Sequence, residues 1–218
     1  MTLMGQSPPD NRRHRGLDAG NSSRTLIYVP IIHTPADMGA LQESVARATL
    51  EKLGRTGLTR KMQRIEEIWT EIERSIGCLP LSFDKVRLYQ DGLPVCGQES
   101  KIVADLAQKG SRNHQLLLRL MAQGATLMGT ESGDLLVQEY QLSIQSLTSR
   151  PPRAAGVMAR RRALGDSLLQ QRDQFIAQRI NETLQRGETG ILFLGVLHAV
   201  ASFLHQDIKV IYPLHRPC

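Results

Sequence analysis

The sequence predicts an α/β fold in which a layered, mixed, mostly parallel sheet of about five strands is flanked by helices. Short apolar segments rich in β-branched and aromatic residues alternate along the chain with longer segments of helical periodicity. With 218 residues, 41% of them hydrophobic, the chain is long enough to bury one core. We therefore expect a disordered polar tail over 1–23 and a single α/β domain over 24–218.

In the N-terminal half, the apolar segment that begins at Thr25 predicts the first strand, which Pro35 ends. Asp37 is placed to cap the helix that follows, and Gly54 is expected to end it. A second helix is predicted by one apolar stripe, made of Met62, Ile65, Trp69, Ile72 and Ile76. An Asp-Gly turn at 91–92 follows the second strand. The expected elements are strand 25–32, helices 37–54 and 59–76, and strand 83–94.

In the C-terminal half, Gly110, Gly124 and Gly187 are expected to end helices. Asp166 is expected to cap a long helix. The Pro- and Arg-rich segment before it predicts a flexible loop over 149–165. The expected helices are 99–108, 113–123, 133–148, 166–186 and a short one at 199–204, and the expected strands are 125–131, 190–198 and 207–214.

The positive charge is concentrated in two segments. The formal net charge is +6. Three arginines lie in the N-terminal tail and five lie between Arg150 and Arg162, so the rest of the chain is close to neutral. This distribution, with only 4% aromatic residues, argues against nucleic acid as a partner. The alternative is that segment 150–162 binds an acidic or nucleic-acid partner, which would make the binding strongly salt-dependent.

The sequence favours a soluble cytoplasmic protein of bacterial type. The first 23 residues lack the apolar core of a signal peptide. The longest apolar stretch, 190–204, is too short for a membrane span and contains a histidine. Three cysteines without metal-site or redox spacing predict reduced thiols. The sequence leaves the oligomeric state open.

Polar side chains follow four of the predicted strands. These residues are His33, Asp91, Glu131 and His198. Each one alone has a structural explanation, such as a packed histidine, a turn aspartate or a glutamate at a helix N-terminus. Because ligands bind beyond the carboxyl ends of parallel strands, the four together indicate a site. They could act as general acid and base, or His33, His198 and Asp91 could bind a divalent metal ion.

The long helix adds Arg172 to these candidates, since this arginine falls on the helix's apolar stripe. Such a position is costly unless a carboxylate or an anionic ligand meets the guanidinium. Glu131 or Asp91 is the expected partner if Arg172 points inward, and a substrate anion is another. The alternative is that Arg172 packs its stem and extends its charge into water.

Three aspartates are candidate substrate-binding residues: Asp37, Asp91 and Asp173. Asp37 is either a helix cap or a member of the site, since it lies four residues after His33. The histidines at 114, 205 and 215 fit no pattern and are expected at the surface or in the core. The nucleotide-loop, HExxH and GxSxG motifs are absent from the sequence.

Two segments of the chain resemble the TraB/PrgY and Tiki superfamily, which includes erythromycin-esterase-like and ChaN-like proteins. The late segment is RDQFIAQRI at 172–180 followed by LFLGVLH at 192–198, and the early one is IYVPIIH at 27–33. Pro30 stands where the family has glycine, and Asp91 follows a strand that usually ends in glutamate. The resemblance implies a mixed sheet with both histidines at one end. Some members look like metal-dependent hydrolases or proteases, and others bind ligands or haem.

These observations lead to two alternative expectations for function. The first is a hydrolase-like enzyme with His33, His198, Glu131 and Arg172 as catalytic residues, a small-molecule or peptide substrate, and a divalent metal ion as a possible cofactor. The second is a non-catalytic small-molecule binding or regulatory protein on the same scaffold.

Overall fold

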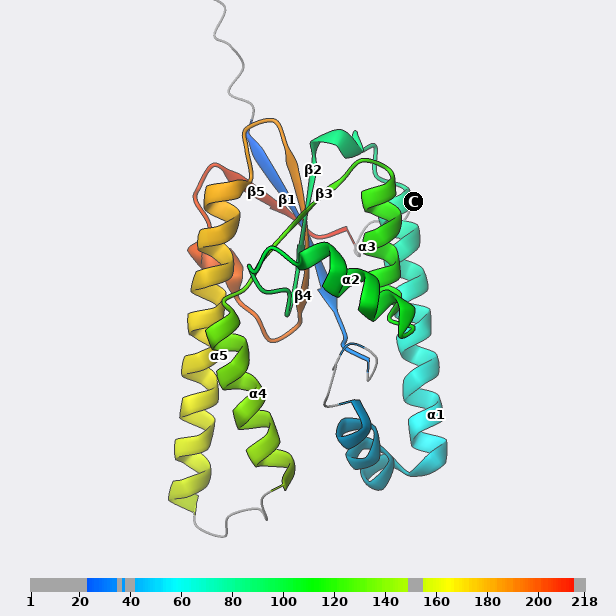
Figure 1. Ribbon diagram of the computed structural model, residues 1–218, viewed down its shortest axis with the longest axis vertical. Coiled ribbons are helices and arrows are strands. Elements are labelled where there is room, and N and C mark those ends of the chain that lie inside the picture. The colour runs from blue at the N-terminus through cyan, green and yellow to red at the C-terminus, as the bar shows by residue number, and fades with distance from the viewer. Residues whose placement is uncertain (1–22, 35–36, 38–41, 149–154, 214–218) are drawn as a thin grey trace, which may run out of the picture.

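The computed structural model describes residues 23–34, 37, 42–148 and 155–213. Its sheet has five strands that all pair in parallel, in the order β3-β2-β4-β1-β5 (Figure 1). The strands are β1 (Arg24–Ile31), β2 (Val86–Gln90), β3 (Thr126–Met128), β4 (Thr189–Gly195) and β5 (Ile208–Ile211). The predicted α/β class, with about five mostly parallel strands flanked by helices, is therefore confirmed.

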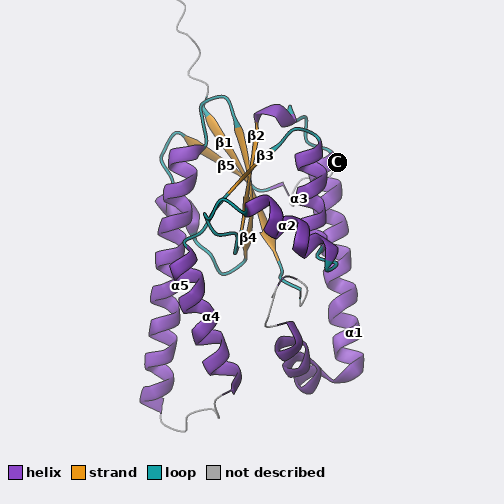
Figure 2. Cartoon of the chain, in the orientation of Figure 1, coloured by secondary structure: helices purple, strands orange, loops and turns teal. Residues whose placement is uncertain are grey.

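Helices cover both faces of this sheet (Figure 2). The described α-helices are α1 (Gln42–Gly77), α2 (Glu99–Gln108), α3 (Arg112–Ala122), α4 (Gly133–Thr148) and α5 (Ala155–Thr183). Two short 3-10 helices, η2 (Phe83–Lys85) and η3 (Val200–Phe203), precede β2 and β5. Helices α1, α2 and α3 lie on one side of the sheet, and α4 and α5 lie on the other.

The period of two along each strand divides the core into two clusters. Alternate strand residues such as Ile27, Val29 and Ile191 pack with α1 and α3 around the fully buried Trp69. The residues between them, such as Leu192, pack against the apolar side of α5. The sheet is therefore the middle of three layers, and both of its faces are apolar.

Several predicted element boundaries are wrong. The helices expected at 37–54 and 59–76 form one element that begins at Gln42 and kinks at Gly54, where φ is 65° and ψ is 175°. Asp37 therefore does not cap α1. Strand β2 covers only 86–90 of the predicted 83–94, because η2 occupies the first three positions and a turn follows.

The loop predicted over 149–165 is wrong for its second part. Helix α5 begins at Ala155, eleven residues before the expected cap at Asp166, and residues 156–164 lie exposed on it. Alanine, methionine and arginine are strong helix formers, so propensity over 155–163 outweighs the local cap signal. The first part of the predicted loop, 149–154, and the predicted disordered tail, 1–22, lie outside the described residues.

None of the described helices combines the length and the apolar character that a membrane crossing requires. Among the cysteines of the described residues, Cys96 is exposed and free, whereas Cys78 is disulfide-bonded. The prediction that all three thiols are reduced is therefore wrong for Cys78, and the expected cytoplasmic location loses that support.

Candidate functional site

The carboxyl edge of the sheet brings the predicted residues together. Strand β4 lies between β1 and β2. The segments after these three central strands therefore begin side by side, although they come from distant parts of the sequence. His33 follows β1, Asp91 follows β2 and His198 follows β4. The fourth predicted residue, Glu131, follows the edge strand β3 and reaches the others through Arg172.

His33 and Asp91 form a hydrogen-bonded pair. His33 Nε2 lies 3.0 Å from Asp91 Oδ2, and the Asp91 side chain is only 5% exposed. A carboxylate can only accept hydrogen bonds, so Nε2 carries the proton of this pair. The described residues leave Nδ1 of His33 without a hydrogen-bond partner. This nitrogen is therefore the one available for proton transfer.

His198 has its own aspartate. Its Nδ1 lies 2.5 Å from Asp173 Oδ1, and Asp173 Oδ2 also accepts from the backbone N–H of Ala199 at 2.8 Å. The second ring nitrogen, Nε2, lies 3.7 Å from Asp91 Oδ2, which is beyond hydrogen-bonding distance. Each of the two histidines thus has one nitrogen held by an aspartate and the other uncommitted.

The local geometry explains why glycine stands at residue 195, three residues before His198. The backbone N–H of His198 donates to the Gly195 carbonyl at 3.1 Å, which closes a turn over 195–198. The Gly195 N–H donates to Asp91 Oδ2 at 2.9 Å. A Cβ at residue 195 would lie 3.0 Å from the same oxygen. A side chain at residue 195 would therefore press on the Asp91 carboxylate, and this close approach favours glycine here.

Arg172 points inward and pairs with both of the partners expected from the sequence. Its Nη2 lies 2.8 Å from Asp91 Oδ1 and 2.5 Å from Glu131 Oε1, and its Nε lies 2.8 Å from Glu131 Oε2. Its Nη1 lies 2.7 Å from Glu139 of α4. Because three carboxylates engage this guanidinium, its geometry suits the positioning of Asp91 and Glu131. The alternative in which Arg172 extends into water is wrong, since its side chain is 5% exposed.

The charges of the cluster favour an anionic Asp91 and a protonated His33. Burial alone would raise the pKa of Asp91, but the hydrogen bond from His33 and the charges of His33, His198 and Arg172 lower it well below its usual range. Burial alone would lower the pKa of His33, but the hydrogen bond to Asp91 and the charges of Asp91 and Asp37 outweigh it and raise the pKa. His33 therefore retains its second proton to a higher pH than an ordinary histidine.

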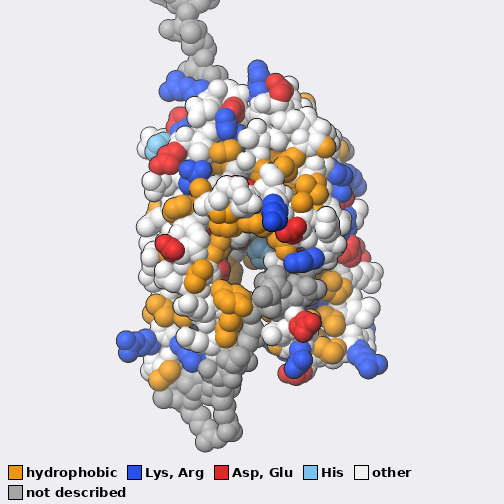
Figure 3. Space-filling model, in the orientation of Figure 1, with side chains coloured by type: hydrophobic (Ala, Val, Ile, Leu, Met, Phe, Trp, Pro, Cys, Tyr) orange, Lys and Arg blue, Asp and Glu red, His pale blue; other side chains and the backbone are white. Residues whose placement is uncertain are grey.

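A cavity of about 600 Å³ opens over these residues. His33, Asp91, Arg172 and His198 lie in its polar part. Most of the wall is apolar and comes from the end of β1, from α2, α4 and α5, and from the segment after β4. In the space-filling view, hydrophobic side chains surround a hollow between the two helical layers, with a histidine visible inside it (Figure 3).

Two of the three predicted substrate-binding aspartates line the cavity, and the third does not. Asp91 and Asp37 line it, whereas Asp173 is 3% exposed and does not. Glu131 is fully buried behind Arg172, where it also accepts from the backbone N–H of Gly92 at 2.9 Å. Asp173 and Glu131 therefore hold other site residues in place and do not reach the cavity.

The structure adds His114 to the site, although no pattern in the sequence singles this histidine out. His114 lies in the first turn of α3 and lines the cavity. Its Nδ1 lies 2.7 Å from Ser111 Oγ, which donates a short hydrogen bond to Asp37 Oδ1. Burial alone would raise the pKa of Asp37, but His114, together with hydrogen bonds from Ser111 and Thr34, lowers it to about 2.

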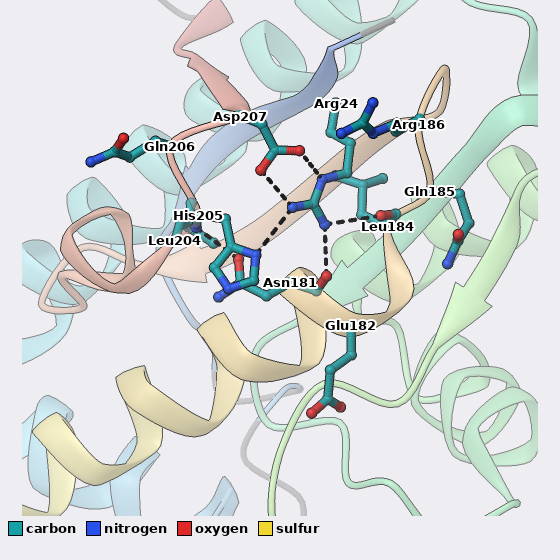
Figure 4. Close-up of a pocket in the computed structure, with 10 residues that line it drawn as sticks. All are labelled: Arg24, Asn181, Glu182, Leu184, Gln185, Arg186, Leu204, His205, Gln206 and Asp207. Carbon is teal, nitrogen blue, oxygen red and sulfur yellow. Dashed lines mark hydrogen bonds and ion pairs between the residues drawn. The ribbon is translucent and has the colours of Figure 1, made fainter. Parts of the chain in front are cut away.

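A second polar cluster lies at the opposite end of the sheet, around Arg24 at the start of β1 (Figure 4). Its guanidinium donates to both carboxylate oxygens of Asp207, to the carbonyls of Asn181 and Leu184, and to Nδ1 of His205. These contacts use all five N–H groups of the arginine. The cluster therefore fastens β1 to α5 and β5 and leaves no Arg24 donor for a ligand.

The predicted metal ligands, His33, His198 and Asp91, meet around the Asp91 carboxylate. Nε2 of His33 and Nε2 of His198 both face Asp91 Oδ2. That oxygen already accepts hydrogen bonds from His33 and Gly195, and Arg172 occupies Oδ1. Across the part of the chain that the structure describes, no group of three or more His, Cys, Asp or Glu side chains is arranged to hold a metal ion.

Comparisons of the chain with protein-family models, with curated proteins and with solved structures found no match.

Proposed function

We propose that this protein is a hydrolase-like enzyme in which His33 and His198 act as general acid and general base on a small-molecule or peptide substrate. One observation supports the proposal most directly. Each imidazole is oriented by its own aspartate, and both rings line the same cavity. A histidine with one nitrogen fixed by a carboxylate is the usual arrangement for proton transfer through the other nitrogen.

The roles of the two histidines follow from their hydrogen bonds. His198 Nε2, opposite the Asp173-bound nitrogen, takes a proton from a water molecule that attacks the substrate carbonyl carbon. His33 Nδ1, which stays protonated because its pKa is raised, donates its proton to the leaving oxygen or nitrogen. The products are the carboxylic acid and the released alcohol or amine. His33 thus loses one proton to the leaving group and His198 gains one from the water, so a proton that moves from His198 to His33 through solvent restores both imidazoles.

The carboxylates and Arg172 position this pair. Asp91 accepts from His33 through Oδ2 while Arg172 holds Oδ1. Glu131 fixes the other side of the guanidinium. Glu131 and Arg172 are therefore proposed as positioning residues. A divalent metal ion held by His33, His198 and Asp91 remains the alternative cofactor of this proposal, and the acid–base scheme assigns no step to it.

The sequence resemblance to the TraB/PrgY and Tiki superfamily agrees with this proposal, because the two segments that carry it, 27–33 and 192–198, end in the two proposed catalytic histidines. Membership of that superfamily and a cytoplasmic location are further parts of the proposal. The alternative function is a small-molecule binding or regulatory protein that uses the same cavity without turnover.

A substrate panel tests the proposal. Chromogenic esters, amides and short peptides would be assayed with the wild-type protein and with His33→Ala and His198→Ala. General acid or base catalysis contributes about 10²- to 10⁴-fold, so each variant should lose at least about 100-fold in kcat/KM. His205→Ala, at the opposite end of the sheet, is the matched control and should retain full activity. Fluorescence of the buried Trp69 verifies that each variant is folded.

Two outcomes would overturn the proposal. Turnover that persists in both histidine variants would exclude them as the acid and base. No turnover of any substrate by the wild type, combined with ligand binding that the histidine variants lose, would favour the non-catalytic alternative.

A further inference from the structure

We propose that His114 is a substrate-binding residue whose Nε2 accepts a hydrogen bond from a hydroxyl or amino group of an amphiphilic, uncharged or cationic substrate. The inference rests on the proposed function for the identity of the site, and it adds the substrate class. Three observations support it: the proton positions around Ser111, the apolar wall of the cavity and the charge of its lining.

The hydrogen bonds around Ser111 determine which nitrogen of His114 is protonated. Ser111 Oγ has one hydrogen, and the Asp37 carboxylate can only accept it. The same oxygen must therefore accept from the His114 ring at 2.7 Å, and it also accepts from the His114 backbone N–H at 3.3 Å. In the neutral ring, Nδ1 of His114 thus carries the proton and Nε2 holds a lone pair.

This lone pair belongs to a ring in the wall of the cavity. The His114 side chain is 5% exposed, and the ring belongs to the cavity wall. Within the described part of the chain, no hydrogen bond reaches Nε2. A buried serine and aspartate therefore hold a ring of the cavity wall whose Nε2 has no partner among the described residues.

The rest of the wall is suited to an apolar group. Apolar residues that line it lie just after β1 and in α2, α4 and α5: Ile32, Ile102, Leu106, Leu136, Tyr140 and Leu169. Val196 and Leu197, which also line it, are 66% and 79% exposed. Large apolar side chains exposed beside a cavity are a feature of surfaces that bind apolar ligands. A substrate of this site therefore combines an apolar part with a polar group.

The charged residues indicate the sign of that polar group. Among the described residues of the lining, Asp37, Asp91 and Glu139 are acidic, and Arg172 is the one permanent cation. One protonated imidazole leaves a net negative lining. An anionic group would be repelled, whereas an alcohol or an ammonium group can donate to His114 Nε2.

Binding of non-hydrolysable probes tests this inference separately from turnover. Isothermal titration calorimetry would compare 1-octanol, octylamine and octanoate, which share one apolar chain and differ in the polar group. The expected result is binding of octanol and octylamine, and at least about tenfold weaker binding of octanoate. Hexylamine should bind roughly tenfold more weakly than octylamine, because two buried methylenes are lost.

Two variants of His114 separate its binding role from its structural role. In His114→Asn, the amide N–H₂ takes the place of Nδ1 and can still donate to Ser111, but the acceptor in the cavity is lost. In His114→Gln, the amide group extends to the place of Nε2. The expected result is about three- to tenfold weaker octylamine binding for His114→Asn and smaller losses for His114→Gln.

Equal affinities of the wild type and His114→Asn, or preferential binding of octanoate, would overturn the inference. Probe binding that depends on His114, in a protein that hydrolyses no ester or amide, would support the inference and reject the hydrolase. Hydrolysis without probe binding would reject the inference and support the hydrolase.

Discussion

Replacing Arg172 by methionine should destabilise the protein strongly, because two buried carboxylates lose the guanidinium that they share. The guanidinium lies within 2.8 Å of Asp91 and Glu131, whose side chains are 5% and 0% exposed. Removing one partner of a buried ion pair costs about 3–5 kcal/mol. We therefore expect Arg172→Met to lower the free energy of unfolding by about 3–5 kcal/mol at pH 7.

Urea unfolding followed by the fluorescence of Trp69, which is 1% exposed, measures this loss. The matched control is Arg179→Met, two turns further along α5. The Arg179 side chain is 24% exposed, and its ion pair with Glu182 is 3.9 Å long. The control should cost less than about 1 kcal/mol.

The loss should also depend on pH with a definite sign. Burial already raises the pKa of Glu131 although Arg172 lowers it, so in Arg172→Met the folded-state pKa rises further above the unfolded value of about 4.3. The loss is then smallest below that pH and grows as the pH increases through the folded-state pKa. Adding Glu131→Gln should recover part of the stability at pH 7. A loss no larger than that of Arg179→Met, or one that is constant between pH 4 and 8, would refute this reasoning.

Three further predictions concern the site. Gly195→Ala would place a Cβ 3.0 Å from Asp91 Oδ2 and should lower kcat/KM by at least about tenfold, whereas Gly165→Ala, which meets open space, should not; equal effects would contradict the close approach. Asp37 has a folded-state pKa of about 2 against about 3.9 in the unfolded chain, so its stabilisation is present above pH 4 and is lost as the pH falls to 2. Urea unfolding at several pH values should therefore show that the free energy of unfolding falls less steeply between pH 4 and 2 in Asp37→Asn than in the wild type. An equally steep fall in both proteins would rule this out. Activity should survive dialysis against a chelator; its loss, with recovery on adding Zn²⁺ or Mn²⁺ and near-stoichiometric metal by elemental analysis, would establish the metal-dependent alternative.

The fold class and most of the site could be predicted because local signals and topology agree. Apolar strands that each end in a polar side chain identified His33, Asp91, Glu131 and His198. An arginine on an apolar helical stripe predicted the buried partners of Arg172. Both inferences depend on the periodic spacing of apolar residues, which shows in a single sequence which positions of a strand or helix are buried.

Other features could not be predicted, because they depend on contacts between distant segments. His114 and Ser111 have the spacing of an ordinary helix N-terminus, and their role depends on Asp37, 74 residues from Ser111 in sequence. Asp37 itself has the position of a cap for the following helix, but its carboxylate binds Thr34 and Ser111. The early start of α5 has a different cause, since a cap signal at Asp166 competed with strong helix formers before it.

The protonation of the histidine rings tests the site most directly and requires no substrate. Long-range ¹H–¹⁵N correlation NMR at a pH where the imidazoles are neutral identifies the protonated nitrogen, and single His→Ala variants assign the signals. We predict the proton on Nε2 for His33 and on Nδ1 for His198, since Asp91 and Asp173 accept from these nitrogens. A proton on Nδ1 of His33 or on Nε2 of His198 would contradict the paired Asp–His arrangement and the acid–base roles inferred from it.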